Sequence, residues 1–139
     1  KAHPGIDQFR ENFRSLSKFI VVGFINTVIC LTFIFTLISF FGVDYRVANF
    51  LGYIIGYIMS FIANRQWTFQ HSGCWKKAFF RWSIVALASY LTNLSIVILV
   101  HSKMGFNVYE AQFLGVFVYT GVSFLGGQFF AFSAEPSRL

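Results

Sequence analysis

Four long apolar stretches constrain this chain more than any other feature of its sequence. They cover residues 19–41, 50–63, 82–100 and 114–132, and they contain almost no charge. The second reaches the length of a membrane span when its polar ends, 48–49 and 64, are included. Backbone that faces lipid must satisfy its own hydrogen bonds, and alternating strand patterns are absent. The sequence therefore predicts an all-α membrane protein with four transmembrane helices.

The distribution of positive charge predicts how these helices cross the membrane. If the N-terminus is cytoplasmic, nine of the 11 lysines and arginines lie inside, and two, Arg46 and Lys103, lie outside. This bias favours cytoplasmic placement of both termini. The basic residues behind the net charge of +6 then face lipid headgroups or anionic substrates at the inner surface. No nucleic-acid partner is expected.

The chain matches itself at an offset of 63 residues without gaps. Comparing residues 18–70 with 81–133 gives 11 identities in 53 positions. We infer a tandem duplication of a two-helix hairpin, with repeats at 18–70 and 81–133 inside a domain of residues 18–133. Because each repeat crosses the membrane twice, both repeats keep the same orientation.

Small residues recur at every fourth position of the second stretch. Gly52, Gly56 and Ser60 form a small-residue ridge, and Gly115 and Ser123 repeat part of it in the fourth stretch. Such ridges let helix backbones approach closely in lipid, where burial supplies little driving force. We interpret the ridge as a helix-packing surface that can also line a substrate path or join two copies. A homodimer or a larger assembly is expected because four helices leave little room for an enclosed groove.

The first 17 residues differ from the rest of the chain in their pattern. Ile6, Phe9, Phe13 and Leu16 recur at helical spacing, with basic residues between them. This pattern predicts a short amphipathic helix on the inner membrane surface, and a disordered tail is the alternative. Residues 134–139 are predicted to form a cytoplasmic tail.

No set of side chains has the spacing of a catalytic or metal-binding site, so we expect neither an enzyme nor a metal or cofactor. The acidic residues lie in tails, in loops or at a helix mouth. A proton-coupled exporter generally needs an ionisable group near the bilayer midplane, which disfavours a small multidrug-type exporter.

Two asparagines lie inside the apolar stretches. Asn26 is in the first stretch and Asn93 is in the third. An amide in hydrocarbon is costly unless it is hydrogen-bonded, so both are expected to face other helices. They either join helices or offer hydrogen bonds to hydroxyl-rich, uncharged groups such as sugars.

Cations and a tryptophan mark the inner ends of the stretches. Arg65 follows Asn64 at the end of the small-residue ridge and lies close to Trp67. A guanidinium at this depth either snorkels to the surface or binds a phosphate with two N–H groups. Lys18 and Arg81, at matched starts of the first and third stretches, can complete a cationic rim.

Two motifs at these positions resemble the GtrA-like family of small four-helix membrane proteins. They are Lys18-Phe19 followed by Val22-Gly23 and Asn26-Thr27, and Asn64-Arg65-Gln66-Trp67-Thr68-Phe69. The resemblance covers essentially residues 18–132, and the N-terminal segment lies outside the family pattern. It implies a role in moving polyprenyl-phosphate-linked sugars across the bacterial cytoplasmic (inner) membrane.

The resemblance implies a substrate such as undecaprenyl-phosphate-glucose, which a membrane glycosyltransferase makes on the cytoplasmic side. Facilitated, uncoupled flipping of this lipid is the first hypothesis. A non-transporting adaptor that recruits or stabilises the glycosyltransferase is the second, and a small multidrug-type exporter is the third. The expected substrate-binding residues are Lys18, Asn26, Asn64, Arg65, Trp67, Arg81 and Asn93.

Overall fold

The computed structural model describes residues 4–133, and for six of these (Pro4, Gly5, Tyr45, Arg46, Val108 and Tyr109) it describes the backbone alone. Within residues 4–133 every regular element is a helix, so the all-α prediction is confirmed. The chain divides into two compact units, unit 1 (Lys1–Gln70) and unit 2 (His71–Leu139). The predicted tail, residues 134–139, lies outside the described residues.

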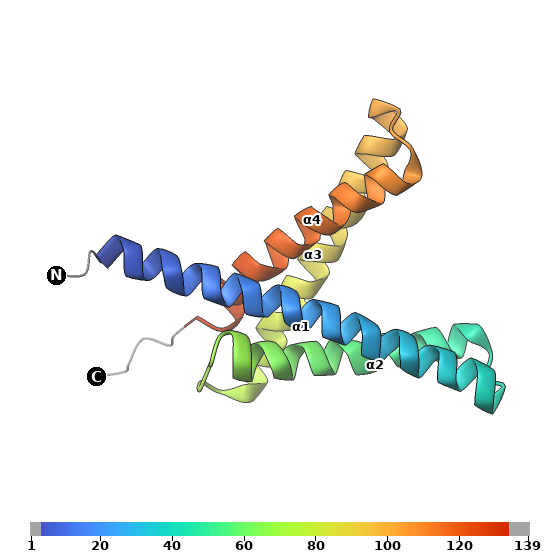
Figure 1. Cartoon of the computed structure of the whole chain (residues 1–139), viewed down its shortest axis with the longest axis horizontal. Coiled ribbons are helices and arrows are strands. Elements are labelled where there is room, and N and C mark those ends of the chain that lie inside the picture. Colours follow the sequence, from blue (N-terminus) through green and yellow to red (C-terminus); the bar gives the residue numbers. More distant parts are fainter. Residues whose placement is uncertain (1–3, 134–139) are drawn as a thin grey trace. The chain divides into compact units, whose positions relative to one another are not determined.

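Unit 1 is a hairpin of two helices that lie side by side (Figure 1). Its elements are α1 (Pro4–Phe41), α2 (Tyr45–Ala63) and a π-helical segment, η1 (Asn64–Thr68), that continues from α2. Gly42 ends α1 because its φ of 63° lies in the left-handed region, which glycine enters without a Cβ clash. The Val43 N–H then donates to the Leu37 carbonyl at 3.1 Å and closes the end of the helix.

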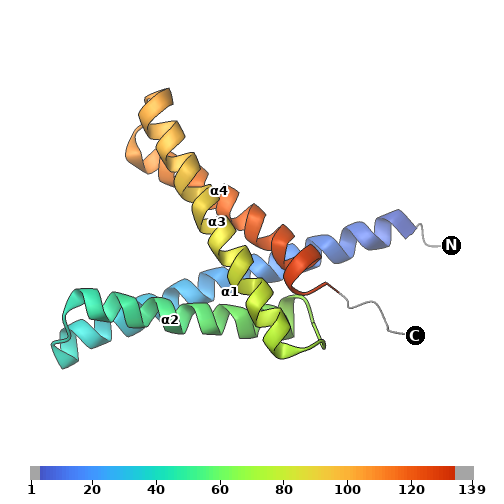
Figure 2. The same cartoon turned by 180° about the vertical axis from the view of Figure 1, so that it is seen from behind.

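Unit 2 is a second hairpin, made of α3 (Trp75–Met104), α4 (Val108–Gly126) and the π-helical segment η2 (Gly127–Ala131) (Figure 2). Gly105 ends α3 with a φ of 75°. Asn107 begins α4 with a capping box, in which its side chain accepts from the Glu110 N–H at 2.9 Å. The Glu110 carboxylate accepts from the Asn107 N–H at 3.0 Å, so two otherwise unbonded donors of the helix start are satisfied.

The elements of the two units match at the offset found in the sequence. Adding 63 to the bounds of α2 and η1 gives the bounds of α4 and η2. The same offset relates the last residues of α1 and α3 and the left-handed glycines Gly42 and Gly105. Apart from the starts of α1 and α3, the two units therefore form the same elements at equivalent positions, although most of their residues differ.

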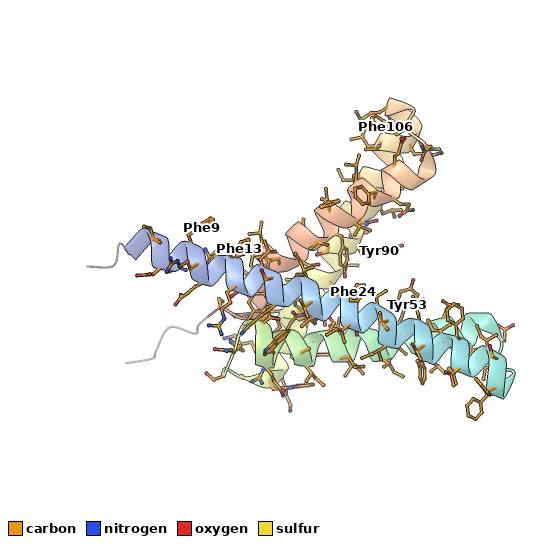
Figure 3. All side chains as sticks on the ribbon, in the orientation of Figure 1. Phe9, Phe13, Phe24, Tyr53, Tyr90 and Phe106 are labelled. Atoms are coloured by element: carbon orange, nitrogen blue, oxygen red, sulfur yellow. The ribbon has the colours of Figure 1, made fainter. Side chains whose placement is uncertain are left out.

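From Pro4 onward the N-terminal segment belongs to α1 and is not a separate helix. We predicted a short helix over residues 1–17 before the first span, but α1 runs without a break from Pro4 to Phe41. A helix of 38 residues is about 57 Å long, whereas the hydrocarbon core is about 30 Å thick. Phe9 and Phe13, 70% and 64% exposed, lie in the N-terminal part of this long helix (Figure 3).

Four helices in the described part of the chain are long and apolar enough to cross a membrane. They cover Ile6–Phe41, Val47–Thr68, Trp75–Met104 and Glu110–Ala131. Only 6% to 28% of the most apolar window of each is buried inside the protein. Exposed Phe24, Tyr53 and Tyr90 illustrate these apolar surfaces (Figure 3), which need lipid around them because water would oppose their exposure.

Close backbone approach holds each hairpin together. A Cβ on Gly52 would lie 2.5 Å from Cγ1 of Ile34, and a Cβ on Gly56 would lie 2.5 Å from Sγ of Cys30. In unit 2, a Cβ on Gly115 would lie 2.8 Å from Cγ2 of Val97. These glycines of the small-residue ridge therefore lie against the partner helix of their own hairpin. Because the hydrophobic effect does not drive helices together in lipid, dispersion contacts at these positions stabilise the pair.

Candidate functional site

The first candidate element is a cation at the end of a helix in unit 1. Lys18 of α1 donates from Nζ to the Trp67 carbonyl in η1 at 3.2 Å, and its Nζ lies 5.5 Å from the centre of the Trp67 ring. The carbonyl end of a helix carries partial negative charge, and an indole face attracts cations. An ammonium has three N–H donors, so this contact leaves Lys18 donors for an anion. Trp67 is 46% exposed, and the pair is therefore accessible.

Unit 2 has the same arrangement at the matched positions. Arg81 of α3 donates from Nη1 to the Phe130 carbonyl in η2 at 3.5 Å, and its Cζ lies 5.6 Å from the centre of the Phe130 ring. Lys18 and Arg81 are 63 residues apart, and so are Trp67 and Phe130. The cation, the carbonyl and the ring thus occupy equivalent positions in the two units. Both side chains that form the contact differ, with Lys and Trp in unit 1 and Arg and Phe in unit 2.

Asn64 is bonded inside its own helix and does not face outward. It is 2% exposed, and its Nδ2 donates to the Ser60 carbonyl at 2.9 Å and to Ser60 Oγ at 3.2 Å. Its Oδ1 accepts from the Thr68 hydroxyl at 2.9 Å. We expected Asn64 to bind the substrate, but its Nδ2 donates to the carbonyl and the hydroxyl of Ser60. The amide links α2 to η1 because burial requires each polar atom to find a partner.

Both π-helical segments are features that sequence reasoning missed. In η1 the Phe69 N–H donates to the Asn64 carbonyl at 2.9 Å, and in η2 the Phe132 N–H donates to the Gly127 carbonyl at the same distance. Because the matched position is Asn in one unit and Gly in the other, the segment does not depend on the amide. Such segments occur frequently at functional sites. The spacing of Ser60, Asn64 and Thr68 was the available signal for the polar chain across η1.

Arg65 follows Asn64 in η1 and is half-buried. It therefore lies in the same five-residue segment as Trp67, whose carbonyl holds Lys18. The matched position in η2 is Gln128, so unit 1 has one more cation in this segment than unit 2.

The two span amides lie against the small residues of the partner helix. Asn26 is half-buried on α1, and its Nδ2 would be 3.4 Å from a Cβ on Gly56. Its Oδ1 accepts a long contact of 3.9 Å from the Cys30 thiol. Asn93 is half-buried on α3, and its Nδ2 would be 3.1 Å from a Cβ on Gly115. The expectation that both amides face another helix agrees with these contacts.

A serine pair joins the helices of unit 2. Ser123 of α4 donates to the Ser89 hydroxyl at 2.8 Å, and Ser89 donates to the Val85 carbonyl at 2.8 Å. Both serines are buried. In unit 1 the matched serine, Ser60, accepts instead from the Asn64 amide. The structure therefore uses the small-residue ridge for contacts within each hairpin.

The predicted binding residues thus fall into separate groups. In unit 1, Lys18 and Trp67 lie together, and Asn26 lies two turns further along α1, about 12 Å away along the helix axis. In unit 2, Arg81 contacts Phe130, and Asn93 lies further along α3, against Gly115. In each unit the first helix therefore has a cation in its N-terminal half and an amide further along.

Comparison with known protein families gives a match over most of the chain. The family model for the GtrA/DPMS transmembrane domain matches residues 18–132. The chain belongs to this family. The resemblance to the GtrA-like family, seen in the sequence motifs, is therefore confirmed. The comparison with curated proteins gave no match.

Membership in the GtrA/DPMS transmembrane domain family agrees with the four apolar helices and indicates a multi-pass membrane protein. The family is linked to polyprenyl-phosphate sugars, and its members are generally non-catalytic. The matched range begins at Lys18 and leaves out the N-terminal part of α1.

Proposed function

We propose that this GtrA/DPMS-domain protein moves a polyprenyl-phosphate-linked monosaccharide, such as undecaprenyl-phosphate-glucose, from the cytoplasmic to the outer leaflet of a bacterial inner membrane. One observation carries the proposal: in unit 1 an accessible Lys18 is held on Trp67, and the Asn26 amide lies about 12 Å further along the same helix. A phosphate followed by a sugar needs a cation and neutral hydrogen-bonding groups in this order.

The phosphodiester of such a lipid carries one negative charge, which an ammonium and a guanidinium at the inner membrane surface attract. Lys18 supplies the donors left after its contact with Trp67, and Arg65 adds a second cation in η1. A charge-assisted hydrogen bond is roughly twice as strong as a neutral one, so these groups dominate headgroup affinity. Asn64 acts indirectly, because its bonds to Ser60 and Thr68 hold the segment that presents Trp67.

The sugar requires partners without charge. Asn26 in unit 1 and Asn93 in unit 2 are amides in the interior of the spans, and each is half-buried beside a glycine. A bare charge in hydrocarbon is expensive, whereas amides lower the cost of a hydroxyl-rich group by hydrogen bonding. The prenyl chain stays in lipid against exposed phenylalanines such as Phe24.

Transport by this route is uncoupled. The described acidic residues are Asp7 and Glu11 in the N-terminal part of α1, Asp44 between α1 and α2, and Glu110 in the first turn of α4. None of these lies in the middle of a span, where proton-coupled transporters place ionisable groups. Consumption of the sugar lipid on the far side supplies the driving force.

The proposal includes a topology and an assembly. Both termini are cytoplasmic, in agreement with the charge bias, and the two units arose by tandem duplication, as the common offset of 63 suggests. The protein acts as a homodimer, since each span buries little of its surface within one chain. A membrane glycosyltransferase supplies the substrate.

Reconstitution of the purified protein tests this function. In liposomes that contain a fluorescent polyprenyl-phosphate-sugar, wild-type protein should expose the label to a membrane-impermeant quencher. Removing a charged hydrogen bond costs about 1.5–3 kcal/mol, so Lys18→Ala should slow flipping roughly tenfold or more. Lys18→Ala with Arg65→Ala should slow it further. The control variant is Lys103→Ala, which removes an exposed cation from the last turn of α3.

Equal flipping rates for the wild type and the double variant would overturn the assignment of the phosphate to Lys18 and Arg65. A measurement of thermal stability on each variant separates loss of binding from loss of folding. Absence of flipping by the wild type, at any lipid concentration, would overturn the function itself.

The adaptor hypothesis is favoured by one observation. The N-terminal part of the long helix α1 exposes Phe9 and Phe13, which offer a surface to a glycosyltransferase. If the protein is an adaptor, the purified protein alone should flip no lipid in liposomes. It should support sugar transfer only when the glycosyltransferase is present. Under that hypothesis Lys18→Ala would leave sugar transfer intact, whereas Phe9→Ser with Phe13→Ser would abolish it.

A further inference from the structure

The contact between a cation, a carbonyl and an aromatic ring occurs twice in this chain. In unit 1 Lys18 bonds the Trp67 carbonyl at 3.2 Å and lies over its ring, and in unit 2 Arg81 bonds the Phe130 carbonyl at 3.5 Å and lies over its ring. Each cation has its partner within its own unit. The two contacts are therefore separate candidate anion-binding positions.

The residues that form the two contacts differ, but the charge of the cation and the exposure of the ring do not. Lysine in unit 1 is replaced by arginine in unit 2, and tryptophan by phenylalanine. Trp67 is 46% exposed and Phe130 is 43% exposed, so both cations lie at accessible rings. The contact with the Phe130 carbonyl uses one hydrogen-bond donor of Arg81. A guanidinium has five, and those not bonded to the Phe130 carbonyl can bind two oxygens of a phosphate.

We propose that unit 2 has its own phosphate-binding site, the Arg81 site, and that the chain therefore binds two prenyl-phosphate headgroups. This inference rests on the proposed function, because it assigns the same class of ligand to the second unit. The Arg81 site binds more weakly than the Lys18 site. Unit 1 adds Arg65 in η1, whereas the matched position in unit 2 is the uncharged Gln128.

Native mass spectrometry of the detergent-solubilised full chain tests the proposal, with undecaprenyl phosphate as the probe. Wild-type protein should bind up to two lipids per chain, with dissociation constants at least tenfold apart. Arg81→Gln keeps an N–H donor for the Phe130 carbonyl but removes the charge, and it should abolish the weaker binding step alone. Lys18→Ala with Arg65→Ala should abolish the tighter step, and Lys103→Ala should change neither.

A second arm identifies the source of the phosphate. Inorganic phosphate should compete with the lipid at both sites if the headgroup alone is recognised. Failure to compete at millimolar concentration would instead assign the sites to lipid that also uses its prenyl chain. Either result supports two sites as long as Arg81→Gln removes one of them.

The outcomes separate this inference from the function on which it rests. One lipid per chain, unaffected by Arg81→Gln, would overturn the second site and leave the function standing. No lipid bound to the wild type would overturn both. Two lipids bound equally to the wild type and to Arg81→Gln would show that Arg81 only closes the helix end, and would also overturn the proposal.

Discussion

Substituting Gly115 by alanine tests the claim that close backbone approach holds each hairpin together. A Cβ at this position would lie 2.8 Å from Cγ2 of Val97, which is about 0.6 Å inside the ordinary contact limit of 3.4 Å. Asn93 adds contacts at 3.1 Å from Nδ2 and 3.3 Å from Cγ. Valine is branched at Cβ and has few alternative rotamers, so α3 and α4 must separate to admit the methyl group.

The same helix provides a matched control. A Cβ on Gly121 would meet nothing within 4 Å, so Gly121→Ala adds a methyl group without overlap. Both substitutions gain the same helix propensity, about 1 kcal/mol, and this gain cancels in their comparison. Overpacking costs about 1–3 kcal/mol. We therefore expect Gly115→Ala to be less stable than Gly121→Ala by about 1–3 kcal/mol.

Equilibrium unfolding in mixed detergent micelles measures this difference. Val97→Ala should recover part of the stability lost in Gly115→Ala, because it removes the atom that overlaps. Equal stability of Gly115→Ala and Gly121→Ala would refute the packing argument. Failure of Val97→Ala to improve the Gly115→Ala variant would show that the cost arises elsewhere.

Three further predictions address other parts of the molecule. Ser123→Ala removes the hydrogen bond to Ser89 and should destabilise the protein by about 0.6 kcal/mol, the average contribution of an interhelical hydrogen bond in a membrane protein. The control Ser95→Ala loses only a bond within α3 and should cost less in the same unfolding assay. Phe9→Trp should place an indole at the lipid interface, so its fluorescence should be quenched by brominated lipids; an unquenched indole would favour a protein partner for this part of α1. The exposed Cys74, between η1 and α3, should react with an impermeant maleimide in inside-out vesicles and not in right-side-out ones, and the opposite result would invert the topology.

The site was only partly predictable from the residues, and Asn64 shows why. Sequence reasoning placed Asn64, Arg65 and Trp67 in one motif and expected all three to face a ligand. The structure buries Asn64 and bonds it to Ser60 and Thr68, although Trp67 three residues later is exposed. Which side of a helix a polar residue faces depends on where the neighbouring helix touches it, and the motif alone does not contain that information.

The contacts of the cations were equally inaccessible to sequence reasoning. Lys18 and Arg81 were matched through the offset of 63, but their partners, Trp67 and Phe130, lie 49 residues further along the chain. The continuation of α1 through the predicted boundary at residue 17 was also missed. The family pattern starts at Lys18, yet helix formation continues wherever local propensity and an apolar face allow it.

The sequence by itself determined that this chain is a membrane protein with four helices long and apolar enough to cross the bilayer. Lipid imposes this result locally, because any stretch of about 20 apolar residues must satisfy its own backbone hydrogen bonds. Only the tertiary structure decided which faces of those helices meet. Lipid and a neighbouring helix are almost equally apolar, so hydrophobicity does not distinguish the packed face, and the approach at Gly52 and Gly115 does.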